Sequence, residues 1–221
     1  MSRVDGKDQN RAALQGNDLV KHSRQPMPNR WVATDEFDFG EGWYDEGFGA
    51  KNDSTVTQYR ALAFIGKKYW LLIDVFTPTD MVEHEYQTWF HLNQTTAQTI
   101  QQPFGASTGN ADAPNLSVLP LRADAPRMEI ITGQTEPELI GWVSNKPCAT
   151  PTFTRRQAGQ CVEPYLLLPT PAGEALPVKA VEMGNNTLRI DFEDGTTDVV
   201  TFTLEGNAIK TMQLNGKTVV E

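Results

Sequence analysis

The sequence predicts an all-β protein, an antiparallel β-sandwich of stacked sheets with little helix. Short runs rich in β-branched and aromatic residues recur along the 221 residues at a spacing of roughly 8–12, which is typical of sandwiches. Asp194-Gly195 and Asn215-Gly216 lie between such runs and favour tight hairpin turns. No stretch carries the apolar period of a helix longer than about two turns.

Composition limits the classes of function. The chain has 28 acidic and 19 basic residues, a net charge of −9, and no basic stripe, which argues against nucleic-acid binding. No run of about 18 apolar residues exists, so no membrane span is expected. A chain of this length buries roughly 70% of its unfolded surface, which fits a single domain over residues 1–221.

Residues 1–30 are predicted to be partly loop. Gln9–Leu14 is compatible with a short helix, whereas Pro26 and Pro28 favour an extended stretch. The polar start, MSRVDGKDQN, lacks the apolar core of a signal peptide. Either the protein is cytoplasmic or its signal belongs to sequence upstream.

Residues 31–49 combine aromatic, acidic and glycine residues. Phe37 and Phe39 alternate with acidic residues, which predicts a half-buried strand. Trp43 and Tyr44, with the two acidic residues that follow, could stack on a sugar and hydrogen-bond it. The alternative, which we favour, is an edge strand protected by its acidic side chains.

Residues 56–76 form the clearest predicted hairpin, with a loop at 66–68 and apolar positions on both faces. A three-residue loop places Arg60 opposite Asp74. Gln58 then lies one diagonal away on the same face. Three polar groups on a buried face indicate either a satisfied ion pair or part of a site.

Further strands are expected in the rest of the chain, while residues 94–115 are expected to be a long connection holding at most one short strand. The expected strands and hairpins cover residues 84–92, 117–123, 128–134, 139–145, 163–168, 186–206 and 209–221. Residues 148–161 are predicted to form a hairpin. Cys148 and Cys161 at its ends are expected to form a disulfide in an oxidising compartment, and to remain thiols in a cytoplasm.

No catalytic motif is present: there is no P-loop, GxSxG or HExxH sequence. The three histidines, His22, His84 and His91, are too few to suggest a histidine-based triad. The residues by themselves indicate an acidic all-β domain with a polar cluster on a buried hairpin.

Six segments, in order, resemble the C-terminal β-sandwich region of heparinase II/III-type polysaccharide lyases. They are VDGKDQ (4–9), FDFGEGWYDEGFG (37–49), RALAFIGKKYWLLIDVF (60–76), EHEYQTWFHL (83–92), GWVS (141–144) and LLLP (166–169). Members of this family place an α/α toroid before the sheets and cleave uronic-acid polysaccharides by β-elimination. The proton-transfer residues come mostly from the toroid. The resemblance implies that this chain is the sandwich without its toroid, or a reading frame cut at that boundary.

The resemblance implies the supporting part of a lyase, inactive by itself, with the toroid as a partner in cis or in trans. It implies an acidic polysaccharide as substrate, contacted here by Trp43, Tyr44, Tyr59 and Arg60, and a periplasmic or secreted location. The alternative is a non-catalytic carbohydrate-binding or structural β-sandwich domain.

The resemblance also implies a zinc ion, because several members bind one in the sandwich. The corresponding positions here are Gln58, Asp74 and His91. Glutamine is a poor zinc ligand beside imidazole, although His84 could supply a third ligand. The alternative, which we favour, is an ion pair between Arg60 and Asp74 with His91 hydrogen-bonded nearby.

Overall fold

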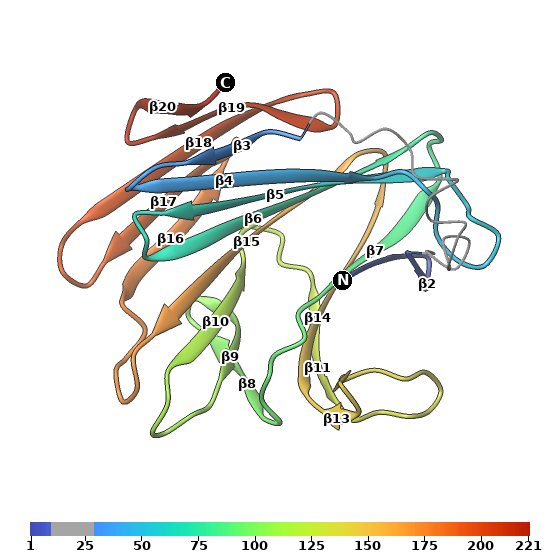
Figure 1. The fold of residues 1–221 in the computed structure, drawn as a ribbon, viewed down its shortest axis with the longest axis horizontal. Coiled ribbons are helices and arrows are strands. Elements are labelled where there is room, and N and C mark those ends of the chain that lie inside the picture. Colours follow the sequence, from blue (N-terminus) through green and yellow to red (C-terminus); the bar gives the residue numbers. More distant parts are fainter. Residues whose placement is uncertain (10–28) are drawn as a thin grey trace.

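The computed structural model describes residues 1–9 and 29–221, and these residues form strands and turns without any helix (Figure 1). None of the described residues therefore forms a membrane-spanning helix. The all-β sandwich prediction is confirmed. Apart from Gln9, the helix expected at Gln9–Leu14 lies outside the described residues, as do Pro26 and Pro28.

A central antiparallel sheet of eight strands contains the predicted hairpin. In spatial order its strands are β3 (Trp31–Ala33), β4 (Phe37–Tyr44), β5 (Val56–Ile65), β6 (Tyr69–Pro78), β15 (Cys161–Thr170), β10 (Asn115–Pro120), β9 (Phe104–Thr108) and β8 (Ala97–Gln101). The expected register is confirmed, since Arg60 lies opposite Asp74. Strand β4 is not the sheet edge that we favoured, because the short strand β3 covers part of it.

Two five-stranded antiparallel sheets flank the central one. The flanking sheet comprises β11 (Arg127–Thr132), β14 (Ala149–Ala158), β7 (Glu83–Trp89), β1 (Ser2–Val4) and β2 (Lys7–Asp8). The C-terminal sheet comprises β16 (Val178–Gly184), β17 (Thr187–Phe192), β18 (Thr197–Glu205), β19 (Ala208–Leu214) and β20 (Lys217–Val220), and contains both predicted hairpin turns. Strands β12 (Trp142–Val143) and β13 (Lys146–Pro147) pair separately.

Each face of the central sheet has its own core. On one face, side chains such as Tyr59 and Ile73 pack with Leu188 and Phe202 of the C-terminal sheet. On the other face, Phe76 stacks on Tyr86 of the flanking sheet, with ring centroids 4.9 Å apart. Burial of each large apolar side chain contributes about 1.5–3 kcal/mol. The result is three layers, with β3–β6 between the other two (Figure 1).

The predicted hairpin at 148–161 is wrong, because β14 and β15 belong to different sheets. Strand β14 pairs with β7 and β11, whereas β15 pairs with β6 and β10. The two strands face each other across the core instead, with the Phe153 and Tyr165 rings 5.1 Å apart. The expected disulfide is also wrong: Cys148 and Cys161 are both buried free thiols.

Three strand boundaries differ from the prediction. Residues 94–115 contain two paired strands, β8 and β9, rather than at most one. The strand expected over 84–92 ends at Trp89, where the chain becomes irregular while Phe90 still donates its amide to the Pro151 carbonyl. The strand expected over 139–145 is reduced to Trp142–Val143.

Candidate functional site

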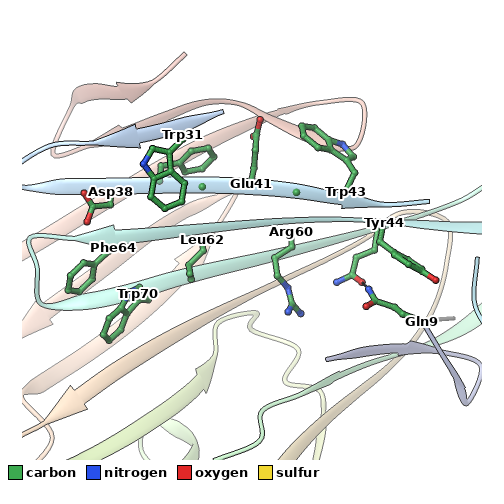
Figure 2. A pocket seen from close by; sticks show the side chains of 14 residues that line it. Gln9, Trp31, Asp38, Glu41, Trp43, Tyr44, Arg60, Leu62, Phe64 and Trp70 are labelled. Atoms are coloured by element: carbon green, nitrogen blue, oxygen red, sulfur yellow. Dashed lines mark hydrogen bonds between the residues drawn. The ribbon is translucent and has the colours of Figure 1, made fainter. Parts of the chain in front are cut away.

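A groove of about 580 Å³ lies on the part of the central sheet that the flanking sheet leaves open. Period-two alternation directs Gly40 of β4, and Arg60, Leu62 and Phe64 of β5, to this face. Figure 2 shows Arg60, Leu62, Phe64 and Trp70 pointing to the same side of the strands, whereas Glu41 and Trp43 point to the opposite side. The groove is therefore formed by alternate residues of neighbouring strands.

Apolar side chains form one wall of the groove. Trp31 is 77% exposed and Leu62 is 40% exposed, although both are large apolar residues. Phe64 and Trp70 stack with ring centroids 4.4 Å apart and planes inclined by 10°. Trp31 lies against Gly40, where a Cβ atom would come 2.9 Å from the indole ring. A glycine at position 40 is thus needed for Trp31 to occupy this place.

Arg60 forms the polar end of the groove together with Asp74. The guanidinium holds the carboxylate with two bonds, from Nε to Oδ1 and from Nη2 to Oδ2, both 2.7 Å long. Asp74 is completely buried, whereas 35% of the Arg60 side chain is exposed. Burial lowers the pKa of Arg60, but the charge of Asp74 and its hydrogen bonds with Arg60 together outweigh this effect, so the net shift of the pKa is upward.

Three further side chains complete the hydrogen bonds of this cluster. Gln58 donates from Nε2 to Asp74 Oδ1 at 2.9 Å and to Ser2 Oγ at 2.8 Å. Thr88 donates to Asp74 Oδ2 at 3.1 Å, and Arg60 donates to Ser2 at 3.0 Å. Both carboxylate oxygens therefore have two donors each, as a buried carboxylate requires. The ion pair that we favoured from the sequence is present.

The zinc ligands expected from the resemblance do not form a suitable site. Gln58 and Asp74 are in contact, but both oxygens of Asp74 are bound to the permanent cation of Arg60. The ring of His91 lies 6.2 Å from that of Trp89, and His84 is held elsewhere by two carboxylates. Among residues 1–9 and 29–221, no three His, Cys, Asp or Glu side chains are grouped to hold a metal. Zinc binding remains a prediction that these donors do not favour.

The four predicted saccharide contacts lie in different environments. Arg60 reaches the groove, and Tyr44 lines it while donating its hydroxyl to the Gly47 carbonyl. Trp43 packs edge-on against Tyr59, with centroids 5.1 Å apart, and its side chain points to the opposite side of the strands from Arg60 (Figure 2). Tyr59 is 0% exposed and lies in the core, so its role as a saccharide contact stays a prediction that its burial does not favour.

Tyr59 belongs to a buried clasp between the central and C-terminal sheets. Its hydroxyl donates to Glu41 at 2.7 Å. Arg30 also binds Glu41, from Nη2 at 2.6 Å, and donates to the carbonyl of Lys210 at 3.2 Å. Burial raises the pKa of Glu41, but the hydrogen bonds from Arg30 and Tyr59 outweigh it and the pKa is lowered overall. This clasp fixes the strand that carries Gly40 and Gly42.

His84 forms a second ionic contact outside the groove. Its Nδ1 lies 2.8 Å from Asp5 and its Nε2 lies 2.9 Å from Asp80. Burial of the ring lowers the pKa of His84, but the two carboxylates raise it by more, so the net shift is upward. The ring thereby joins the β1–β2 turn to the β6–β7 turn.

The sequence analysis missed Trp31, Leu62, Phe64 and Trp70 as groove residues. The predicted register already placed Leu62 and Phe64 on the same face as Arg60, because side chains repeat with period two. What the sequence did not reveal is that the flanking sheet leaves this end of the face uncovered.

No protein-family model matches the sequence, and no curated protein sequence matches it either. Solved structures do match. A mutant of a heparan sulfate lyase from Pedobacter heparinus superposes with a TM-score of 0.58 and 18% identity, over 81% of this chain and 28% of that chain. The structure named for the enzyme without the mutation gives a TM-score of 0.56 and 17% identity, over 77% and 26% of the two chains. A heparinase III structure gives 0.53 and 14%, over 80% and 27%.

This chain therefore spans little more than a quarter of the length of these structures. At such low identities the likeness concerns the fold, and it extends over most of this chain. The fold expected from the six sequence segments is confirmed: the chain has a heparinase-like fold.

Proposed function

We propose that this chain is the β-sandwich region of a heparinase-like lyase that cleaves uronic-acid polysaccharides by β-elimination. In this proposal an α/α toroid, in cis or in trans, supplies the proton-transfer residues, and the groove forms one wall of the substrate cleft. The observation that carries the proposal is an open aromatic groove on a heparinase-like fold.

The groove has the chemistry of a saccharide site. Binding sites are typically apolar and aromatic with a few placed polar groups, and here Trp31 and the Phe64–Trp70 stack lie beside Arg60. The apolar face of a sugar ring can pack on the aromatic side chains. A guanidinium is suited to a uronate carboxylate because it presents several donors in one plane.

The described groove residues do not supply a proton-transfer pair. A general base must come within hydrogen-bond reach of the proton that it removes. Tyr44 is the one tyrosine among the described lining residues, and no histidine is among them. The Tyr44 hydroxyl is buried and donates to the Gly47 carbonyl. These contacts favour a structural rather than a catalytic role for the isolated chain.

The second candidate function is a carbohydrate-binding domain without a lyase partner. It is favoured by the observation that the described residues form the aromatic wall and the arginine without help from another domain. A coding sequence for an α/α toroid upstream of this region supports the lyase, whereas an unrelated gene or a stop codon there supports the binding domain.

The activity test uses the purified chain with heparan sulfate, alginate and hyaluronan. Formation of the unsaturated product is followed by its ultraviolet absorbance. We expect no turnover from the chain alone. Clear turnover would overturn the proposal that the chemistry lies outside this region. A periplasmic or secreted location is part of the proposal, and fractionation of the source cells tests it.

A further inference from the structure

We propose that a cavity among β8, β9 and β10 binds an uncharged sugar through hydrogen bonds to the sugar hydroxyls. This β8–β10 cavity has a volume of about 360 Å³ and is lined by these three strands and by the segment that follows β15. Sites for small molecules have volumes of about 300–1,000 Å³. The proposal goes beyond the proposed function and does not depend on it, because this cavity and the groove lie on opposite faces of the central sheet.

Strand register places the β8–β10 cavity on the face that the C-terminal sheet covers. Ser117 of β10 lines the cavity, and Leu168 lies opposite it on β15, in the core shared with the C-terminal sheet. Val118, the next residue, belongs with Leu72 to the core on the other face. Leu72 in turn lies opposite the groove residue Leu62. Directly paired side chains share a face and successive ones alternate, so the two sites are separated by the sheet.

Buried hydroxyl groups form the floor of the cavity. Gln98, Ser107 and Ser117 lie in a row across it, because the strand pairing puts them opposite one another. Ser117 donates to Ser107 Oγ at 3.0 Å, and Ser107 donates to the Thr108 carbonyl at 3.2 Å. A hydroxyl has one hydrogen and two lone pairs, so the oxygen of Ser117 can still accept a hydrogen bond. This floor favours a ligand that donates hydrogen bonds.

The loop after β9 forms a wall that is already ordered. Asn115 Oδ1 accepts from the Thr108 hydroxyl at 2.9 Å and from the Asn110 amide at 2.8 Å. Asn115 Nδ2 donates to the Asn110 carbonyl at 3.0 Å, and Thr108 Oγ1 accepts from the Leu116 amide at 2.9 Å. These bonds fix the wall before a ligand arrives, which lowers the entropic cost of binding.

Three exposed side chains at the cavity have unused hydrogen-bonding capacity. Gln98, Gln102 and Glu174 line the cavity, and their side chains make no hydrogen bond or ion pair with any described residue. An amide both donates and accepts, and a carboxylate can accept from two neighbouring hydroxyls. Ile100 and Leu176 are half-buried and add apolar surface for the C–H face of a sugar ring.

The carboxylate of Glu174 gives this cavity a different preference from that of the groove. Glu174 is the one charged side chain among the described residues that line the cavity. Its negative charge repels a uronate carboxylate or a sulfate, whereas it accepts hydrogen bonds from the hydroxyls of an uncharged sugar. The groove instead presents the guanidinium of Arg60. The cavity therefore fits an uncharged sugar better than an acidic one.

The test is a nuclear magnetic resonance titration of the full chain with cellobiose, lactose and N,N′-diacetylchitobiose, and with digalacturonate as the charged comparison. We expect at least one neutral disaccharide to shift the amide signals of β8–β10 and of Glu174, and to bind roughly fivefold or more tightly than digalacturonate. Absence of these shifts with all three, or shifts confined to the groove strands β4 and β5, would overturn the proposal. Equal or tighter binding of digalacturonate in the cavity would also overturn it. The proposed function is tested separately by the lyase assay.

Three variants locate the binding in the cavity. Gln98→Ala and Glu174→Ala should each weaken binding of the neutral sugar roughly fivefold, through the loss of its hydrogen bonds. Glu174→Gln removes the negative charge and should bring the affinity for digalacturonate closer to that for the neutral sugar. Gln213→Ala is the matched control, because Gln213 is an exposed glutamine of β19 that does not line the cavity. Thermal melts establish that each variant is folded. Unchanged binding in the folded Gln98→Ala and Glu174→Ala proteins would contradict the assignment.

Discussion

Arg60→Ala is expected to destabilise the protein more than Asp74→Ala, although the two residues form a single ion pair. Removing one partner of a buried pair costs about 3–5 kcal/mol, because the other charge is left uncompensated. Without Arg60, the carboxylate of Asp74 remains completely buried, with only Gln58 and Thr88 as donors. Without Asp74, the Arg60 guanidinium can turn into the open groove, since 35% of the side chain is already exposed.

We therefore place Arg60→Ala near the upper end of that range and Asp74→Ala near the lower end. For a chain of this size, about 1 kcal/mol shifts the melting temperature by roughly 2–4 °C. The two variants should then melt about 6–20 °C below the wild-type protein. The assay is urea unfolding with thermal melts, with and without a metal chelator.

The double replacement Arg60→Leu with Asp74→Leu is the control. It should recover much of the loss, because two packed apolar side chains need no partner. About 1–2 kcal/mol should remain lost, since Gln58 and Thr88 no longer have Asp74 as an acceptor. If the double variant loses as much unfolding free energy as the two single variants lose together, the ion-pair reasoning is refuted. A chelator-dependent penalty confined to Asp74→Ala would instead identify the carboxylate as a metal ligand.

Three further predictions concern pH, metal and backbone geometry. The pKa of His84 is raised in the folded protein, so His84 contributes stability that is complete below about pH 6.5 and is lost as pH rises through the raised pKa. The stability advantage of the wild-type protein over His84→Gln should therefore shrink in urea titrations from acid to alkaline pH. Purified protein should carry well under one zinc per chain by elemental analysis, and stoichiometric zinc after dialysis would contradict this. Gln58→His should raise the zinc content if the resemblance aligns the site correctly. Gly47→Ala should cost about 1–3 kcal/mol in urea unfolding, because φ is +89° and the new Cβ would meet the Asn52 backbone at 2.4 Å. Gly6→Ala, with φ +70° and no atom within 4 Å, is the matched control and should cost less.

The central hairpin shows how far local sequence can determine a structure. Its loop at 66–68 fixes the register, and the register fixes that Arg60 faces Asp74 with Gln58 beside them. These relations depend on residues close in sequence, so they could be predicted. Successive side chains of a strand point to opposite faces of the sheet, so the adjacent residues Tyr59 and Arg60 could not both face one groove. The prediction that both contact the saccharide did not take this into account.

The sequence by itself determined the all-β class, the main hairpins and the ion pair, because hydrophobic alternation and loop length are local properties. Only the tertiary structure decided that β14 and β15 enter different sheets. Cys148 and Cys161 therefore do not lie at the two ends of one hairpin, and both are free thiols. It also decided which end of the central sheet stays open, and so made Trp31 and Leu62 groove residues rather than core residues. Both outcomes depend on how whole sheets cover one another, and this is set by contacts between residues far apart in the sequence.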